Sequence, residues 1–270
     1  MLGIRMKAKL LLATVFLAGG FSLFAQPWAK ARLEASSRHG EWVDVTNGAR
    51  VVRCFLVYPE VKDPAPAVVV IHEIFGLTDW ARNAADEVAA AGCIAIAPDL
   101  LSGLGPKGGG SSDFASIDDV RGAISKLPGD QVMGDLNAAA DYVKKLPAAN
   151  GKLAVAGFCW GGGKSFAFAT DRPDLSAAFV FYGPPPAVEE MARIKCPVYG
   201  FYAGNDARIS ATIPKTKSEM KAADKTYEPV KYDGAGHGFM RMGEQPDASP
   251  PNKEAHDKAW QRFKKLLAKL

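Results

Sequence analysis

Runs of apolar residues alternate with segments of helical spacing along most of the chain. Residues 67–72 (AVVVIH) and 93–97 (CIAIA) are continuous apolar runs, which are typical of strands buried on both faces of a sheet. Between them, residues 80–91 have helical spacing and are followed by Gly92, a residue suited to a helix C-cap. This stretch predicts a strand–helix–strand unit, the building block of a parallel sheet.

The same alternation continues to the C-terminus. We predict further strands at residues 51–58, 153–156, 177–182, 198–203 and 227–232, and further helices at residues 117–127, 131–146, 213–223 and 252–270. Elements in this order give an α/β protein with a mostly parallel sheet of about seven or eight strands, covered by helices on both faces. Because the sequence shows no internal repeat, we expect one domain over residues 41–270.

The N-terminus has a different pattern. Three basic residues precede an apolar run over residues 10–25, which is the layout of a secretory signal peptide. The run is shorter than the roughly 20 residues that cross a bilayer. We therefore predict a signal peptide over residues 1–25, a polar leader over residues 26–40, and a periplasmic or secreted protein with no stable membrane insertion after cleavage. An uncleaved anchor is the alternative.

Composition and charge restrict the partners of this protein. Hydrophobic residues make up 48% of the chain, enough for a full buried core. The formal net charge is +4, but the first 25 residues carry three positive charges and no acid, which leaves +1 for the rest. This balance does not suggest a nucleic-acid partner. We expect a small-molecule substrate, no cofactor, no metal, and a monomer.

Four cysteines are present, and their spacing fits no zinc site, because there is no CxxC motif and no nearby pair of histidines. Cys54, Cys93 and Cys196 lie in or beside apolar runs, which predicts buried free thiols. An exported protein permits disulfides, so one bridge among these three cysteines remains open.

The fourth cysteine lies in the sharpest local motif, Gly157-Phe158-Cys159-Trp160-Gly161, between a predicted strand and a small-residue helix. This is the nucleophile elbow G-x-S-x-G with cysteine in place of serine. Glycines flank the nucleophile because larger side chains would collide in the tight turn. The helix N-terminus is expected to lower the pKa of the thiol, and the N–H of Trp160 to stabilise an oxyanion. The alternative is a buried structural cysteine in a glycine turn.

Such an elbow requires an acid and then a histidine later in the chain. Asp206 and His237 each follow a predicted strand, where sheets of this kind place their functional residues. His237 would take the proton of the thiol, and Asp206 would orient the imidazole. Asp99 and Asp233 fit the position of the acid less well than Asp206.

A second oxyanion donor is expected directly after the strand at residues 67–72. The N–H of Ile74 is our candidate, and Glu73 then brings a carboxylate close to the thiol. A surface salt bridge is the alternative for Glu73. Together these residues predict an α/β-hydrolase fold that cleaves a carboxylic ester or lactone through an acyl-enzyme on Cys159.

The motifs HEIFG, PDL, GFCWGG, GND and GHGFMR, in this order from about residue 51 onwards, resemble those of the dienelactone hydrolase family. The resemblance implies an α/β-hydrolase fold, a triad of Cys159, His237 and Asp206, and carboxymethylenebutenolidase-like action on lactones or other esters. It also implies that Glu73 helps convert the thiol to thiolate when substrate binds, and that Arg241 holds a substrate carboxylate.

The chain departs from the family pattern in two respects. A second carboxylate-binding arginine is expected shortly after PDL, but residues 100–104 contain none, which loosens the prediction of the substrate. The predicted signal peptide is the second departure, because enzymes of this family that degrade aromatic compounds are expected in the cytoplasm. Two other classes remain open: a periplasmic thiol-redox or sensing protein that uses Cys159, and a binding protein without turnover.

Overall fold

The computed structural model describes residues 26–270, and the predicted signal peptide over residues 1–25 lies outside the described residues. The strands are β1 (Gly40–Asn47), β2 (Arg50–Val57), β3 (Ala65–Ile71), β4 (Ile94–Pro98), β5 (Ala149–Phe158), β6 (Ala177–Phe181), β7 (Val198–Ala203) and β8 (Tyr227–Tyr232). The helices are α1 (Pro27–Ala35), α2 (Asp79–Ala90), α3 (Ile117–Ser125), α4 (Gly129–Lys144), α5 (Trp160–Asp171), α6 (Val188–Met191), α7 (Ala207–Ser210), α8 (Ile213–Ala222), α9 (Phe239–Met242) and α10 (Pro250–Leu267), with the 3₁₀ turns η1 (Pro106–Gly108) and η2 (Ser111–Asp113).

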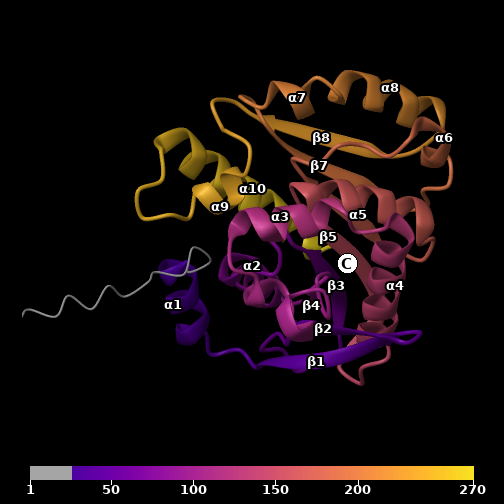
Figure 1. Cartoon of the computed structure of the whole chain (residues 1–270). Helices are drawn as coiled ribbons and strands as arrows, with labels where there is room; N and C mark the ends of the chain where they lie inside the picture. The colour runs from indigo at the N-terminus through magenta and orange to yellow at the C-terminus, as the bar shows by residue number, and fades with distance from the viewer. Residues whose placement is uncertain (1–25) are drawn as a thin grey trace, which may run out of the picture.

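All eight strands form one sheet in the order β1-β2-β4-β3-β5-β6-β7-β8. Strand β2 runs antiparallel to both of its neighbours, β1 and β4, and the pairs from β4 to β8 are parallel. The predicted α/β fold, with about eight mostly parallel strands, is therefore confirmed. Since parallel strands end at the same edge, this topology collects the loops after β3, β5, β6, β7 and β8 on one side of the molecule (Figure 1).

Two hydrophobic layers cover the sheet, one on each face. In β3, Val69 and Ile71 pack in the layer that contains α4 and α5, whereas Val68 and Val70 pack in the layer that contains α2 and α10. Figure 1 shows these helix pairs on opposite sides of the central strands. Burial on both faces explains why the central strands read as continuous apolar runs rather than alternating ones.

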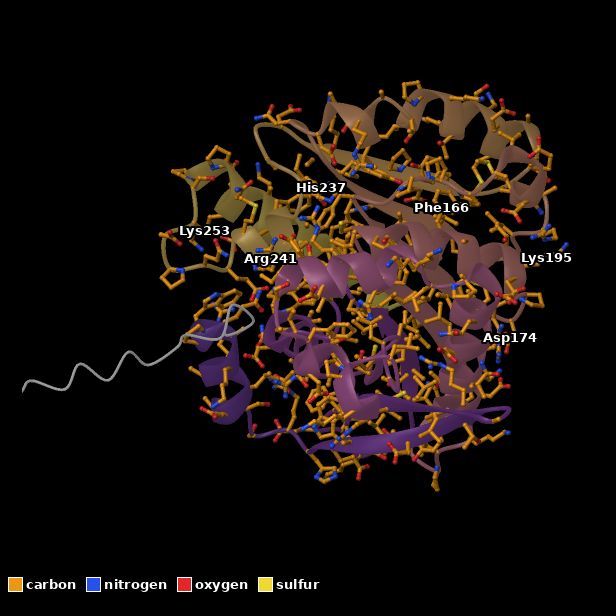
Figure 2. All side chains as sticks on the ribbon, viewed as in Figure 1. Phe166, Asp174, Lys195, His237, Arg241 and Lys253 are labelled. Atoms are coloured by element: carbon orange, nitrogen blue, oxygen red, sulfur yellow. The ribbon has the colours of Figure 1, made fainter. Side chains whose placement is uncertain are left out.

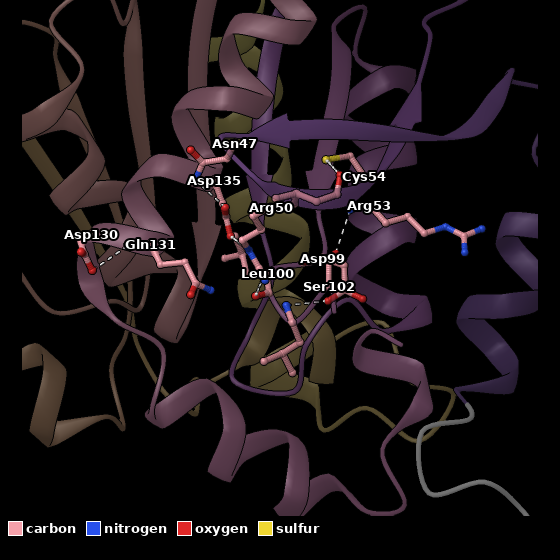
Figure 3. A network of polar contacts seen from close by, with 12 residues as sticks. Asn47, Arg50, Arg53, Cys54, Asp99, Leu100, Ser102, Asp130, Gln131 and Asp135 are labelled. Atoms are coloured by element: carbon pink, nitrogen blue, oxygen red, sulfur yellow. Dashed lines mark hydrogen bonds and ion pairs between the residues drawn. The ribbon is translucent and has the colours of Figure 1, made fainter. Parts of the chain in front are cut away.

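Strand β1 was not predicted, because it lies at the edge of the sheet and its residues alternate between exposed positions and positions that, except for the buried Val45, are only partly buried. Its turn into β2 is anchored by Asp135 of α4, a fully buried carboxylate that accepts from Asn47 Nδ2 and Arg50 Nε, each at 2.9 Å (Figure 3). Arg50 Nη2 also donates to the carbonyl of Leu100 at 3.0 Å. The hairpin is thereby fixed to α4 and to the loop after β4.

The predicted leader contains helix α1, which packs against α2. Arg32 Nη1 of this helix donates to the buried carboxylate of Glu244 at 2.8 Å, and the side chain of Gln26 accepts from the backbone N–H of Trp80. Residues 26–35 therefore join the folded domain rather than trail from it. None of the helices between residues 26 and 270 combines the length and the apolar character that crossing a membrane requires.

All four cysteines are free thiols, and Cys54, Cys93 and Cys196 are buried. This confirms the prediction of buried structural thiols, and the disulfide that the sequence left open is not formed. Burial in the core also shields these three thiols from oxidants, which leaves Cys159 as the partly accessible one.

Candidate active site

Four predicted site residues follow the carboxyl ends of parallel strands. Cys159 follows β5, Asp206 follows β7, His237 follows β8, and Glu73 follows β3. Figure 2 shows His237 and Arg241 close together, where the C-terminal part of the chain meets the central helices. The sheet topology thus brings together residues that are separated by more than 160 positions in the sequence.

Cys159 occupies a tight turn between β5 and α5. Its backbone angles are φ 58° and ψ −117°, a conformation that residues with a side chain rarely adopt. A Cβ atom on Gly157 would lie within 3 Å of the backbone carbonyl of Gly161, and one on Gly161 would lie within 3 Å of the carbonyl oxygens of Ile71 and His72. Both positions therefore require glycine, as the elbow motif predicts.

Cys159, His237 and Asp206 form a continuous chain of contacts. The Sγ atom of Cys159 lies 3.0 Å from Nε2 of His237, and Nδ1 of His237 lies 2.5 Å from Oδ2 of Asp206. The Asp206 side chain is 8% exposed, whereas that of His237 is 32% exposed. With Nδ1–H donating to the carboxylate, Nε2 is left as the acceptor for the thiol proton.

The backbone N–H groups of Trp160 and Ile74 interact favourably with the sulfur of Cys159 and lower its pKa. They are the donors that the sequence predicted for an oxyanion. The expectation that the thiol has a lowered pKa is nevertheless wrong for this site. Burial first, and the carboxylate of Glu73 second, raise the pKa of Cys159 to about 11. Cys159 is therefore a neutral thiol at neutral pH and needs a base to become nucleophilic.

Glu73 forms a buried ion pair with Arg241. Arg241 Nε donates to Glu73 Oε2 at 2.7 Å, and the two side chains are 18% and 4% exposed, respectively. Burial raises the pKa of Glu73, and the charge of Arg241 opposes that shift. The guanidinium also lies over the ring of Phe75, 5.2 Å from its centroid. The alternative prediction for Glu73 was a surface salt bridge. Glu73 does form a salt bridge, but the pair is buried beside the thiol rather than exposed at the surface.

Replacement of Glu73 by glutamine is expected to lower the pKa of Cys159 by about one unit, because the neutral amide removes a negative charge that disfavours the thiolate. The measurement is the rate of alkylation by iodoacetamide against pH, with the modified peptide identified by mass spectrometry. Glu60→Gln is the matched control, since Glu60 is exposed and precedes the opposite end of β3. If the pH profile of alkylation in Glu73→Gln stays in place or moves to higher pH, the charge of Glu73 does not raise the pKa of Cys159.

Two further residues contribute to the site but were not predicted from the sequence. Tyr182, directly after β6, is fully buried and has φ 41°; its ring lies edge-on to that of His237 with the centroids 5.1 Å apart. Its hydroxyl has no hydrogen-bond partner within residues 26–270. His72 is also buried, and its ring stacks on Trp160 with centroids 5.7 Å apart. Their positions after buried strands were the only sequence signal for either residue.

The rival acids lie away from the triad contacts. Asp99 accepts from the backbone N–H and the hydroxyl of Ser111, so it fixes the glycine-rich loop after β4 rather than a histidine. Asp233 is exposed. Within the described part of the chain, no group of three or more His, Cys, Asp or Glu side chains is arranged to hold a metal ion.

An eight-stranded sheet of this order, with a nucleophile elbow after β5 and an acid and a histidine after β7 and β8, defines an α/β-hydrolase. The family model "Dienelactone hydrolase family" matches residues 52–270. The protein named "Putative carboxymethylenebutenolidase" of Methylorubrum extorquens is 33% identical over 83% of this chain and 81% of its own length. A protein of the same name from Salmonella typhimurium is 32% identical over 78% of this chain and 80% of its own. The chain belongs to the dienelactone hydrolase family.

Solved structures agree with this assignment. The structure titled "Putative Dienelactone Hydrolase" from Klebsiella pneumoniae has a TM-score of 0.76 at 26% identity and covers 87% of this chain and 100% of its own. The dienelactone hydrolase from Anabaena variabilis has a TM-score of 0.64 at 20% identity, over 84% of this chain and 98% of its own, which shows a shared fold. The protein is therefore a hydrolase by family as well as by architecture.

Proposed function

We propose that this protein hydrolyses a carboxylic ester or lactone through an acyl-enzyme on Cys159. The observation that carries the proposal is the chain of contacts from Sγ of Cys159 through His237 to Asp206, with the N–H groups of Trp160 and Ile74 directed at the same sulfur. These are the parts that acyl transfer needs: a nucleophile, a base, a residue that orients the base, and donors for an oxyanion. The names of the relatives, which describe a lactone hydrolase, point to the same class of substrate.

In the first half of the reaction, Nε2 of His237 takes the thiol proton while Sγ attacks the carbonyl carbon. The carbonyl oxygen becomes an oxyanion, which the N–H groups of Trp160 and Ile74 stabilise. The intermediate collapses as the bond to the leaving oxygen breaks, and His237 gives that oxygen its proton. In the second half, His237 takes a proton from water, the hydroxide attacks the thioester carbon, and the thiol of Cys159 is restored when the acid leaves.

The buried ion pair is proposed to control the charge of the thiol and to meet the substrate. Only Nε of Arg241 bonds to Glu73, so its terminal nitrogens remain for a substrate carboxylate, as the family resemblance implies. An anion bound there draws Arg241 away from Glu73. The pKa of Glu73, already raised by burial, then rises further, so its carboxylate takes up a proton and no longer disfavours the thiolate that His237 generates.

Export to the periplasm or secretion is part of the proposal, supported by the basic start and the apolar run over residues 10–25. A thiol-redox function has less support, because the other three cysteines are buried free thiols and offer Cys159 no accessible partner.

Steady-state turnover of a panel of small lactones and aryl esters, with and without a free carboxylate, tests the function. We expect hydrolysis without added metal or cofactor, and a lower rate in Arg241→Ala for substrates that carry a carboxylate. Stoichiometric acylation without release would instead identify a binding protein. Absence of both acylation and turnover across the panel would contradict the proposal.

A further inference from the structure

Glu244 is a buried carboxylate, two residues beyond the end of α9, whose ionic partner comes from α1. Arg32 Nη1 donates to Oε2 of Glu244 at 2.8 Å. Asn83 Nδ2 donates to the same oxygen at 3.1 Å, and Trp80 Nε1 donates to Oε1 at 3.3 Å. The Glu244 side chain is 3% exposed, and no other lysine or arginine between residues 26 and 270 lies within ion-pair distance of it. Burial raises the pKa of Glu244, and the charge of Arg32 opposes this rise more than any other group does, so Arg32 stabilises the ionised carboxylate.

The backbone next to Glu244 carries groups of the candidate active site. Residues 237–244 begin with the histidine of the proposed triad and contain Arg241 in α9. The N–H of Glu244 donates to the carbonyl of Arg241 at 3.3 Å. From the other side, Nδ1 of His256 in α10 donates to a backbone carbonyl of α9 at 2.9 Å. This segment is therefore held between two anchors, His256 on α10 and Arg32 on α1.

Helix α1 lies outside residues 52–270, the part of the chain that the family model matches. It is nevertheless fixed to the domain. Ala29 is fully buried in the hydrophobic layer that contains α2 and α10, and the side chain of Gln26 accepts from the N–H of Trp80 at 2.8 Å. The helix is therefore a firm support for Arg32, and it adds a link to the site from outside the family model.

We propose that Arg32 is a positioning residue, which acts through Glu244 on the imidazole of His237. Nε2 of His237 lies 3.0 Å from Sγ of Cys159, and proton transfer requires such a hydrogen-bond distance. Without Arg32, the carboxyl of Glu244 must take up a proton or move towards water. In either case α1 loses its ionic link to residues 237–244, and the imidazole is held less firmly against the thiol. The inference rests on the proposed acyl transfer and adds a residue that supports it.

The first test measures the hydrolysis of 4-nitrophenyl butyrate by Arg32→Ala. We expect kcat to fall about tenfold to a hundredfold with KM changed by less than about twofold, because the base is displaced while the neutral ester still binds. Arg32→Lys should recover part of kcat, since lysine keeps the positive charge. Lys30→Ala is the matched control and should keep its activity. Lys30 and its partner Glu34 are exposed on the same helix, so this variant removes a cation of α1 without contacting Glu244.

Chemical rescue separates positioning from a general loss of stability. A cavity of about 320 Å³, lined in part by Arg32, Glu244 and His256, borders the ion pair. A guanidinium ion can therefore occupy the place of the missing side chain and bind the carboxylate of Glu244. We expect guanidinium chloride, at concentrations far below those that unfold proteins, to raise kcat of Arg32→Ala but not of the wild type. Sodium chloride at the same concentration should have no such effect.

An unchanged kcat in Arg32→Ala would overturn the proposal. So would a loss of kcat that follows the unfolded fraction, measured by circular dichroism at the assay temperature, and that guanidinium does not restore. Alkylation of Cys159 by iodoacetamide separates this inference from the proposed function. At neutral pH it should be slower in Arg32→Ala and be restored by guanidinium, whether or not the esters are hydrolysed. Failure of ester turnover with this response intact contradicts only the hydrolysis, whereas an unchanged alkylation rate contradicts the role of Arg32.

Discussion

Replacement of Cys159 by alanine is expected to reduce kcat for aryl-ester hydrolysis by at least about 10⁴-fold. The thiol is the group that attacks the carbonyl in the proposed reaction, and it lies 3.0 Å from the base that activates it. Within residues 26–270, no hydroxyl group hydrogen-bonds the imidazole of His237, whose Nδ1 bonds Asp206. The remaining rate is what oriented binding and the two N–H donors supply without a nucleophile. Initial rates at saturating ester, compared with the uncatalysed reaction, measure the effect.

Cys196→Ala is the matched control for the loss of a thiol. Cys196 is a buried free cysteine that precedes β7 at the amino end of the sheet, opposite the site. We expect this variant to keep its activity within about threefold of the wild type. Near wild-type hydrolysis by Cys159→Ala would show that another group attacks the substrate.

Replacement of Gly161 by alanine is expected to lower the free energy of unfolding by about 3 kcal/mol. The new Cβ would lie within 3 Å of the carbonyl oxygens of Ile71 and His72, which belong to backbone and cannot rotate away. Either α5 or the end of β3 must move, and both carry parts of the site. Urea unfolding followed by circular dichroism measures the loss, and ester hydrolysis should fall with it.

Gly122→Ala provides a comparison within the same chain. Gly122 lies inside α3 and has nothing within 4 Å of an added Cβ, so alanine there should stabilise the protein by roughly 0.5–1 kcal/mol. Equal effects of the two substitutions on the free energy of unfolding would show that the close approach of backbone segments at the elbow does not restrict position 161 to glycine.

The fold was predictable because the central strands are buried on both faces and therefore appear as continuous apolar runs. Strand β1 and helix α1 were missed for the opposite reason: they lie at the edge of the structure, and most of their residues are exposed or half-buried. The nucleophile elbow and the order of Cys159, Asp206 and His237 along the chain could also be predicted. A short motif and the order of residues are both visible in the sequence itself.

Properties that depend on burial could not be predicted from the sequence. A helix N-terminus predicted a lowered pKa for the thiol, but burial and Glu73 outweigh the two N–H groups and raise it. Arg241 was expected to hold a substrate carboxylate, but its buried ion pair with Glu73, at 2.7 Å, was not expected. Tyr182 gains its significance only from the strand that places its ring beside that of His237.

Mass spectrometry of the protein quenched with acid during turnover of a slowly hydrolysed aryl ester tests the central claim most directly. We predict a transient mass increase equal to that of the acyl group, located on the peptide that contains Cys159 and absent from Cys159→Ala. An acyl group on a different residue, or rapid turnover during which no acylated peptide can be trapped, would contradict the acyl-enzyme on Cys159.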